Sequence, residues 1–354
     1  MRIGIPSETK PLEGRVALVP YACGDLVKAG HEVAIQSGAG DKSGFCDGDF
    51  SKVGVKVVPD AAALFDFAEL VVKVKEPIAG DLSHLQSHHR LFCYLHLAAE
   101  PALTQSLKDI GLTAVAFETV EESGGQLPLL APMSIIAGRI AVQVGTHLLH
   151  QPQGGRGVLL GGLGGAERGH IVVLGAGAAG GHAASLAAAG GARVTVFDKR
   201  TDRLEAMMAQ ADNISALYPY SEAVAEAVSE ADLVIGAVLV TGARAPHVVT
   251  REMVSEMAPG SIMIDISVDQ GGCFETTKPT TYENPTYVVD GVMHFAVTNM
   301  PGAVPRTSSQ ALSAAILPYV MKMAGSNWRD DPALVRGVNV EQGTVVHPAL
   351  QEVA

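Results

Sequence analysis

Basic residues are scarce in this chain of 354 residues. Lys and Arg number 25 against 37 Asp and Glu, which gives a formal net charge of −12. Nucleic acids bind basic surfaces that neutralise their phosphates, so we expect no nucleic-acid partner. Small anionic substrates are not excluded, because a local pair of cations can bind a carboxylate whatever the total charge.

Cysteine is scarce as well. Four cysteines lie scattered along the chain without the spacing of a metal-binding motif: Cys23, Cys46, Cys93 and Cys273. We therefore expect reduced thiols in a cytoplasmic protein, and no metal site.

Apolar segments of the kind that direct a chain to a membrane are missing. The N-terminus, MRIGIPSETK, has no signal-peptide core. Residues 171–192 run for 22 residues without Asp, Glu, Lys or Arg, but they are mostly Gly and Ala and include His182. A buried strand, turn and helix explain this composition better than a bilayer helix, so we expect no membrane partner.

The chain does have enough apolar material for two cores. Hydrophobic residues make up 47% of the sequence, and 354 residues exceed one ordinary domain. Val- and Ile-rich segments alternate with helix-like ones, which indicates an α/β fold with parallel strands and crossover helices. The strand-like segments of the first half are RIGIP, HEVAIQ, VKVV, ELVVKVK, LFCYLHL and TAVAFET, and the helix-like ones include 21–29 and 101–109.

Two long helices are expected near the domain boundaries. One covers 133–150, and the other, QALSAAILPYVMKMAG, could be capped by Ser308 or Ser309 and return to the first domain. We expect a discontinuous first domain, 1–132 plus about 305–354, and a second domain of about 133–304. The second domain is predicted to contain strands at 171–174, 193–197, 232–236, 261–266 and 286–289, and helices at 178–189, 201–210, 221–229 and 250–257.

A glycine-rich turn in the second domain has the pattern of a dinucleotide-binding site. The strand HIVVL leads into Gly175, Gly177 and Gly180, an Ala-rich helix follows, and the next strand ends at Asp198, 23 residues after Gly175. The glycines allow a tight turn, approach of the pyrophosphate and close packing of helix on strand, while the helix N-terminus offers N–H donors. A Gly-rich turn without a ligand is the alternative, but strand, turn, helix, strand and acid in this order favour NAD.

Asp198 favours NAD over NADP. Its carboxylate can accept hydrogen bonds from the ribose hydroxyls and would repel a 2′-phosphate. Lys199 and Arg200 follow directly and could soften that repulsion, so the strictness of the preference stays open.

Charged residues follow several strands of the first domain. Arg15 lies near a predicted helix start, and Lys75 and His96 end the strands ELVVKVK and LFCYLH. Ligands collect at the carboxyl ends of parallel strands. Each residue alone is better explained as a solvated charge or a core histidine, but together they offer two cations for a carboxylate and carbonyl and one imidazole for proton transfer. Asp269, after a strand of the second domain, is a fourth candidate or a plain turn aspartate.

The chain resembles the alanine dehydrogenases nearly from end to end. That family performs reversible, NAD-dependent oxidative deamination of L-alanine to pyruvate and ammonia. The resemblance rests on several blocks in the family's order: RIGIPSETK with the following Arg15, VKVKEP, YLHLA, LLAPMSIIAG, QGGRGVLLGG, VVLGAGAAG, DLVIGAVLVTGARAP, VDQGGCFE and NMPGAVPRTS.

The resemblance implies a fold and roles for individual residues. It implies two Rossmann-like α/β domains with parallel sheets, joined by long helices, with the active site in the interdomain cleft, usually assembled as hexamers. It makes the first domain the substrate domain, where Arg15 and Lys75 bind substrate, and makes His96 and Asp269 catalytic, with His96 as general acid/base. It places four further residues near cofactor or substrate: Ser134, Arg203, Leu239 and Asn299.

Two alternatives use the same scaffold. The NAD-binding subunit of proton-translocating transhydrogenase resembles alanine dehydrogenase but has no amino-acid site. The full set of Arg15, Lys75, His96 and Asp269, and the lack of a membrane segment after residue 324, favour the dehydrogenase. An opine-type enzyme such as saccharopine dehydrogenase would need a larger cleft.

Overall fold

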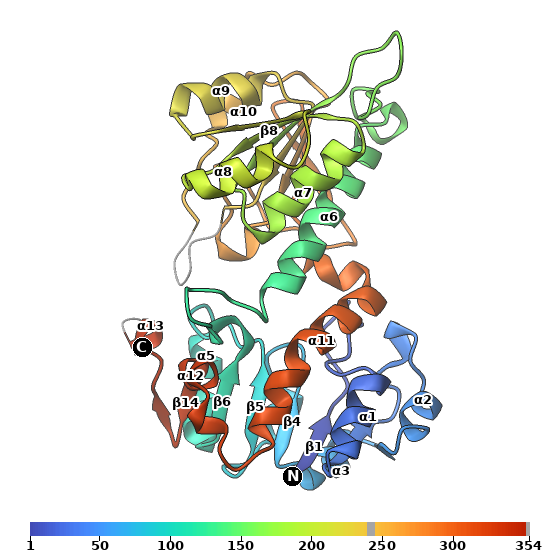
Figure 1. The fold of residues 1–354 in the computed structure, drawn as a ribbon, viewed down its shortest axis with the longest axis vertical. Coiled ribbons are helices and arrows are strands. Elements are labelled where there is room, and N and C mark those ends of the chain that lie inside the picture. Colours follow the sequence, from blue (N-terminus) through green and yellow to red (C-terminus); the bar gives the residue numbers. More distant parts are fainter. Residues whose placement is uncertain (239–244, 352–354) are drawn as a thin grey trace. The chain divides into compact units, whose positions relative to one another are not determined.

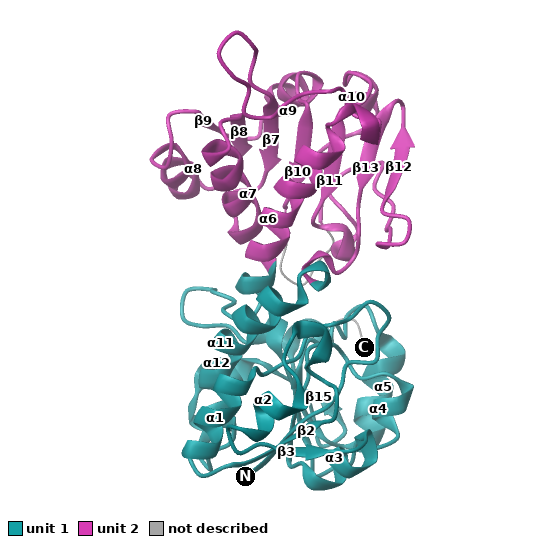
Figure 2. Ribbon diagram, turned by 90° about the vertical axis from the view of Figure 1, so that its right-hand side faces the viewer, with its two compact units in different colours: residues 1–133, 302–354 teal, residues 134–301 magenta. Residues whose placement is uncertain are grey.

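The computed structural model describes residues 1–238 and 245–351 and divides the chain into two compact units. Unit 1 comprises residues 1–133 and 302–354, and unit 2 comprises residues 134–301 (Figure 2). The chain leaves unit 1 within helix α6 (Ala131–Leu148) and returns within the 3-10 helix η5 (Met300–Ala303). Unit 2 is therefore an insertion into a discontinuous unit 1.

Unit 1 is built on an eight-stranded sheet with the order β15-β14-β6-β5-β4-β1-β2-β3. The first six strands in the chain pair in parallel. The chain runs outward from β1 to β3 and then returns to β4 on the other side of β1, so the direction of travel reverses between β1 and β4. The strands are β1 (Arg2–Ile5), β2 (Glu32–Gln36), β3 (Lys56–Val58), β4 (Leu70–Val72), β5 (Arg90–Cys93), β6 (Thr113–Ala116), β14 (Val338–Glu341) and β15 (Thr344–Val345).

Helices cover both faces of this sheet (Figures 1 and 2). Right-handed crossovers place α1 on one face, where it packs against α11, and α3, α4 and α5 on the other. Pro20 at the first position and Lys28 in the last turn favour the helical ends of α1. The helices of unit 1 are α1 (Pro20–Lys28), α2 (Asp47–Ser51), α3 (Ala61–Phe67), α4 (Ala79–Leu82), α5 (Pro101–Ile110), α11 (Pro305–Met323), α12 (Pro332–Arg336) and α13 (Pro348–Gln351).

Unit 2 contains a seven-stranded sheet with the order β12-β13-β11-β10-β7-β8-β9. All neighbours are parallel except the edge pair β12–β13. The direction of travel reverses here between β7 and β10. The strands are β7 (His170–Leu174), β8 (Arg193–Phe197), β9 (Ile214–Leu217), β10 (Leu233–Gly236), β11 (Ile262–Asp265), β12 (Thr286–Val289) and β13 (Val292–Phe295).

Two apolar clusters lie on opposite faces of the unit 2 sheet. One joins Ile171 and Val173 of β7 to Ala183 of α7 and Ala141 of α6, and the other joins Val172 to α9 and α10. Gly138 of α6 lets this helix approach the start of α7 closely, since a Cβ on Gly138 would lie 2.0 Å from the Ala179 oxygen. The helices besides α6 are α7 (Ala178–Ala189), α8 (Thr201–Met208), α9 (Ser221–Ser229) and α10 (Arg251–Ser255).

The two mostly parallel α/β sheets confirm the predicted fold class. The sequence did not predict the antiparallel edges, where β14 pairs with β6 and with β15. Across residues 1–238 and 245–351, none of the helices is both long and apolar enough to cross a membrane. The uncharged segment 171–192 instead contains most of β7, a turn, all of α7 and the turn that follows it.

The predicted capping of the long C-terminal helix is wrong. α11 begins at Pro305, and Ser308 and Ser309 lie buried inside it rather than at its N-cap. Pro305 fixes the helical backbone angle at the first position, so the helix starts a turn earlier than a serine cap would allow. The Ser309 hydroxyl accepts a hydrogen bond from the backbone N–H of Val16 at 2.9 Å, which ties α11 to the loop after β1.

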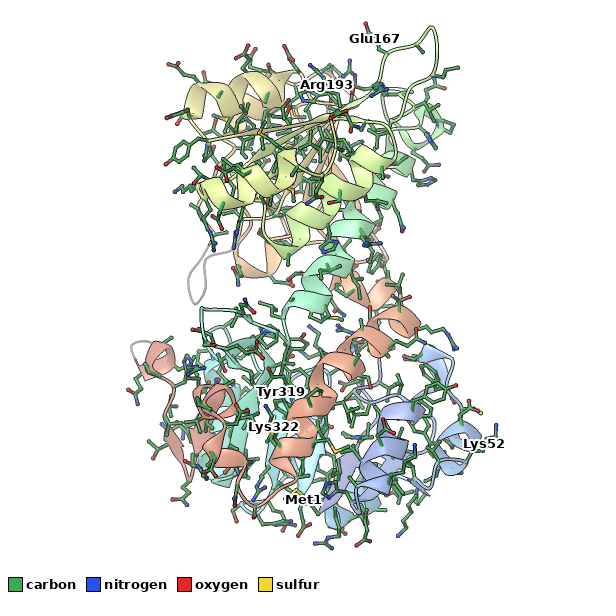
Figure 3. All side chains as sticks on the ribbon, in the orientation of Figure 1. Met1, Lys52, Glu167, Arg193, Tyr319 and Lys322 are labelled. Carbon is green, nitrogen blue, oxygen red and sulfur yellow. The ribbon has the colours of Figure 1, made fainter. Side chains whose placement is uncertain are left out.

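α11 also contacts the rest of unit 1 near its C-terminal end. Tyr319 and Lys322 lie one turn apart on α11 (Figure 3), and the Lys322 ammonium lies 5.3 Å from the centre of the Tyr319 ring. The Tyr319 hydroxyl donates a hydrogen bond of 2.6 Å to the carboxylate of Glu122. α11 is thus bound to the loop that follows β6.

Candidate functional site

The glycine turn after β7 leaves no room for a side chain at two of its three glycines. Gly175 has a φ of 99°, a left-handed value, and a Cβ there would lie 2.5 Å from the Ala237 oxygen. A Cβ on Gly180 would lie 1.7 Å from the Gly175 oxygen. Gly177 is the N-cap of α7, so backbone N–H groups rather than a side chain lie at the start of this helix. These residues fit a dinucleotide, whose pyrophosphate needs close approach and N–H donors.

Asp198 is bonded directly to the glycine turn. It follows β8, whose Phe197 pairs with Leu174 of β7. One carboxylate oxygen accepts a hydrogen bond of 2.7 Å from the Ala176 N–H, and the other accepts one of 2.8 Å from the Arg200 N–H. The Arg203 guanidinium lies 3.4 Å from Asp198 and is 41% exposed, so it borders the same site.

The direction reversal between β7 and β10 marks the ligand-binding crevice of such a sheet. Ala237, directly after β10, therefore lies against the glycine turn, since a Cβ on Gly175 would meet its oxygen. Leu239, predicted to contact the cofactor, lies outside the described residues. Ser134 lies in the first turns of α6, and Asn299, with a φ of 60°, directly precedes η5.

Asp269 is exposed in the short 3-10 helix η4 (Val268–Gln270) that follows β11. The loop around it is closed by a different aspartate, Asp265, which is buried at the end of β11. Asp265 accepts hydrogen bonds of 2.9 Å from the N–H groups of Ser267 and Cys273 and a further one from the Thr277 hydroxyl. Burial raises the pKa of Asp265, although these donors oppose the shift.

In unit 1, the reversal between β1 and β4 brings Arg15 and Lys75 to the same edge of the sheet. Arg15 lies in the loop after β1 and is only 3% exposed. Glu13 accepts hydrogen bonds from its guanidinium with both carboxylate oxygens, and the guanidinium also contacts the Met133 sulfur at 3.2 Å. Burial disfavours the charge of Arg15, but the hydrogen bonds and charge of Glu13 outweigh it and raise the pKa. A fixed, permanently charged guanidinium of this kind suits a carboxylate ligand.

Lys75 does not end a strand, contrary to the sequence prediction. β4 stops at Val72, and Lys75 lies half-buried three residues later. The carboxylate of Glu8 accepts hydrogen bonds from the N–H groups of Val74, at 2.6 Å, and Lys75, at 3.4 Å. The ladder ends because a side chain, rather than the neighbouring strand, takes these donors.

A buried lysine lies just before Lys75. Lys73 is 1% exposed, and its ammonium lies 3.4 Å from Glu8 and 3.3 Å from Asp81. Burial lowers the pKa of Lys73, but the two carboxylates outweigh it and raise the pKa overall. Burial raises the pKa of Glu8 despite the charge of Lys73. Lys73 thus holds Glu8 in place behind the backbone of Lys75.

His96 also lies beyond its strand. β5 ends at Cys93, and His96 is exposed in the following turn with a φ of 50°. The carboxylate of Glu118 accepts hydrogen bonds from the backbone N–H groups of Leu95, at 3.1 Å, and His96, at 2.6 Å. LFCYLHL is therefore a strand followed by a turn, and its histidine is neither in the ladder nor in the core.

Tyr94 supports the His96 ring from one side. The two rings are stacked, with centres 5.9 Å apart and planes 8° apart. Tyr94 is itself fixed, since it is buried and its hydroxyl donates a hydrogen bond of 2.6 Å to the Leu129 oxygen.

Sequence reasoning missed the carboxylates behind these side chains: Glu8, Glu13, Glu118 and Asp265. A signal did exist for Glu118, which follows β6 as Lys75 and His96 follow their strands. Among residues 1–238 and 245–351, no group of three or more His, Cys, Asp or Glu side chains could hold a metal ion.

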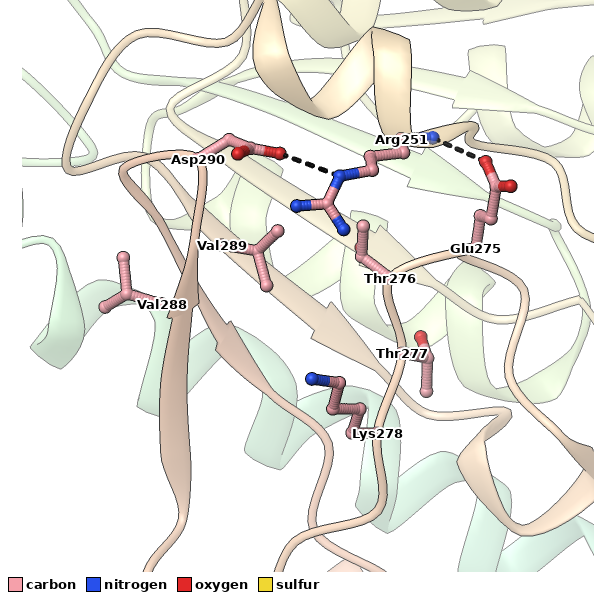
Figure 4. Close-up of a pocket in the computed structure, with 8 residues that line it drawn as sticks. All are labelled: Arg251, Glu275, Thr276, Thr277, Lys278, Val288, Val289 and Asp290. Carbon is pink, nitrogen blue, oxygen red and sulfur yellow. Dashed lines mark hydrogen bonds and ion pairs between the residues drawn. The ribbon is translucent and has the colours of Figure 1, made fainter.

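None of the candidate residues lines the surface pocket of unit 2 that Figure 4 shows. The Arg251 guanidinium in this pocket pairs with Asp290 at 3.4 Å, and the Lys278 ammonium lies 5.9 Å from the centre of the Tyr287 ring. The pocket is lined by Arg251, Glu275, Thr276, Thr277, Lys278, Val288, Val289 and Asp290.

Known proteins share this arrangement along the whole chain. The profile of the family described as alanine dehydrogenase/PNT, N-terminal domain, matches residues 4–137, and that of the C-terminal domain matches residues 141–348. The alanine dehydrogenase of Halomonas elongata is 49% identical over 99% of this chain and 96% of its own length. That of Mycobacterium tuberculosis is 47% identical over 98% of this chain and 95% of its own length.

Solved structures agree. An L-alanine dehydrogenase superposes with a TM-score of 0.96 at 48% identity, covering 100% of this chain and 99% of its own. A transhydrogenase from Sinorhizobium meliloti superposes with a TM-score of 0.85 at 26% identity, covering 99% of this chain and 100% of its own. The resemblance to the alanine dehydrogenases is confirmed, and the chain belongs to the alanine dehydrogenase/PNT family.

Proposed function

We propose that this chain is an NAD-dependent L-alanine dehydrogenase that converts L-alanine and water reversibly to pyruvate and ammonium. The observation that carries the proposal is the group of Arg15, Lys75 and His96 at the carboxyl edge of the unit 1 sheet, two of them beside the β1–β4 reversal. The relatives closest in sequence among those compared above are alanine dehydrogenases, whereas the transhydrogenase is at 26% identity.

The residues of unit 1 have distinct tasks in this proposal. Arg15, fixed by Glu13, binds the substrate carboxylate, and Lys75 binds and polarises the carbonyl oxygen of pyruvate. His96 accepts and returns a proton at an imidazole nitrogen as water adds to the substrate carbon and ammonia leaves. Its exposed ring suits an exchange of protons with substrate and solvent.

The residues of unit 2 serve the cofactor and the water. Gly175, Gly177 and Gly180 allow the pyrophosphate to approach. Asp198 accepts hydrogen bonds from the ribose hydroxyls, and Arg203 lies beside it. When bound, NAD supplies an acceptor for a hydride from the substrate. Asp269 orients the attacking water and offsets positive charge, and Ser134, Leu239 and Asn299 complete the contacts to cofactor and substrate.

The proposal extends to the cofactor preference, the assembly and the cellular location of the protein. The carboxylate of Asp198 disfavours a 2′-phosphate, which supports NAD over NADP. A hexamer follows from the family resemblance alone. A cytoplasmic location is supported by the four cysteines, of which Cys23, Cys93 and Cys273 are buried and all four are free thiols.

The activity is tested by following NADH absorbance. Purified protein should reduce NAD when L-alanine is added, and oxidise NADH when pyruvate and ammonium are added together. A protein that binds NADH, turns over in neither direction and exchanges hydride with a partner protein would be a transhydrogenase subunit instead.

A further inference from the structure

One carboxylate holds the turn that carries His96. Glu118 lies in the 3-10 helix η2 (Phe117–Thr119), directly after β6, and is half-buried. β5 and β6 are parallel neighbours that pair Cys93 with Ala116, so Glu118 follows its strand at the same level as residues 94–96, which lead into the turn. The contact therefore results from the sheet register rather than from closeness in sequence.

Glu118 binds two consecutive N–H groups. Its Oε1 accepts both the Leu95 N–H, at 3.1 Å, and the His96 N–H, at 2.6 Å, while its Oε2 lies 3.3 Å from the Leu95 nitrogen. Two successive backbone N–H groups that point to one side form a concave anion-binding arrangement. A charged acceptor binds such donors more strongly than a neutral one.

The turn needs this support, because His96 has a left-handed backbone. A φ of 50° is unfavourable for a residue with a Cβ, and it persists only where the surroundings enforce it. Residues held in such conformations cluster at functional sites. Tyr94 stacks on the imidazole ring, whereas Glu118 binds the backbone from which the ring projects.

We infer that Glu118 is a positioning residue, whose carboxylate holds the backbone of Leu95 and His96 so that the imidazole points to the substrate. The inference rests on the proposed function and deepens it, since it assigns a role that acts through His96. Glu118 itself neither binds substrate nor transfers the proton. Glu118 holds His96 by hydrogen bonds, as Glu13 holds the Arg15 side chain and Glu8 holds the Lys75 backbone.

The first test is Glu118→Gln, with Glu121→Gln as its matched control. The amide keeps the shape but replaces one acceptor oxygen with a donor and removes the charge. Glu121 lies three residues further on, and its hydrogen bond with Arg336 uses the backbone oxygen, so its variant should behave as the parent. Glu118→Gln should lower kcat on the order of 10- to 100-fold, as misplaced catalytic groups do, with little change in KM for pyruvate and in NADH affinity.

A double variant separates positioning from general stability. In a His96→Asn background the imidazole is gone, so adding Glu118→Gln should change kcat less than about twofold. An equal fractional loss in both backgrounds, or an unchanged kcat in Glu118→Gln alone, would overturn the inference while leaving the dehydrogenase activity established.

Hydrogen exchange gives a readout that does not depend on activity. The Leu95 and His96 amides should exchange faster in Glu118→Gln than in the parent or Glu121→Gln, since a neutral amide oxygen binds them more weakly than a carboxylate does. If the parent protein proves inactive with L-alanine and pyruvate, the proposed function fails, and unchanged exchange at these two amides would separately refute the hold of Glu118 on the turn.

Discussion

Replacing Gly180 with alanine should damage both the stability of unit 2 and its affinity for NADH. The new Cβ would lie 1.7 Å from the oxygen and 2.9 Å from the carbon of the Gly175 carbonyl, so the glycine turn or the start of α7 must move by more than about an ångström. Overpacking of this kind costs about 1–3 kcal/mol. Alanine regains about 1 kcal/mol of helix propensity, and because backbone cannot give way easily, the net loss should be near 2 kcal/mol.

The next residue provides the control. A Cβ on Gly181 would meet only the Met207 side chain at 3.5 Å and the Ala176 oxygen at 3.6 Å, which are ordinary contacts. Gly181→Ala lies in the same turn of α7 and adds the same methyl group, so it should keep its affinity for NADH and gain up to about 1 kcal/mol from helix propensity.

Denaturant unfolding and NADH fluorescence titration measure the two effects. Gly180→Ala should unfold at lower denaturant and bind NADH about tenfold more weakly or worse, which corresponds to about 1.4 kcal/mol. The affinity falls because the displaced helix start no longer directs its N–H groups at the pyrophosphate. If the two variants unfold together and bind NADH equally well, the close approach at Gly180 has no bearing on the cofactor.

Four further variants test the remaining residues. Arg15→Ala and Lys75→Ala should each depress pyruvate reduction sharply and leave NADH binding nearly intact; an equal loss of NADH affinity would place them at the cofactor instead. His96→Asn should cut kcat about 10²- to 10⁴-fold with little change in thermal unfolding, because asparagine tolerates the left-handed backbone but does not titrate; a loss of stability alone would make His96 structural. Asp198→Gly should erode the preference for NAD over NADP, measured as the ratio of kcat/KM values, and an unchanged ratio would point to Lys199 and Arg200.

The sequence predicted the glycine turn well because its requirements are local. Gly175, Gly180 and the strand before them are adjacent in the chain, and Asp198 follows the next strand. The edge of the sheet on which Arg15 and His96 lie could also be anticipated, since parallel strands end at a common edge. The exact ends of β4 and β5 could not be anticipated from the sequence.

What ends those strands comes from elsewhere in the chain. Glu8 is 66 residues from Val74, and Glu118 is 22 residues from His96, so no local pattern reveals that these carboxylates replace the neighbouring strand as acceptors. The sequence did not predict the short strands β14 and β15 for a related reason. β14 forms a strand because it pairs with β6, and β15 because it pairs with β14.

The insertion of unit 2 into unit 1 sets an order on how the protein can form during synthesis. Unit 2 is one continuous stretch, so all of it is synthesised before α11 and β14 are. During that interval β6 is an unpaired edge, and the face of the sheet that α11 covers is open. The last residues to be synthesised thus complete the domain that begins the chain. A chain truncated near residue 301 and released would contain all of unit 2 but an unfinished, aggregation-prone unit 1.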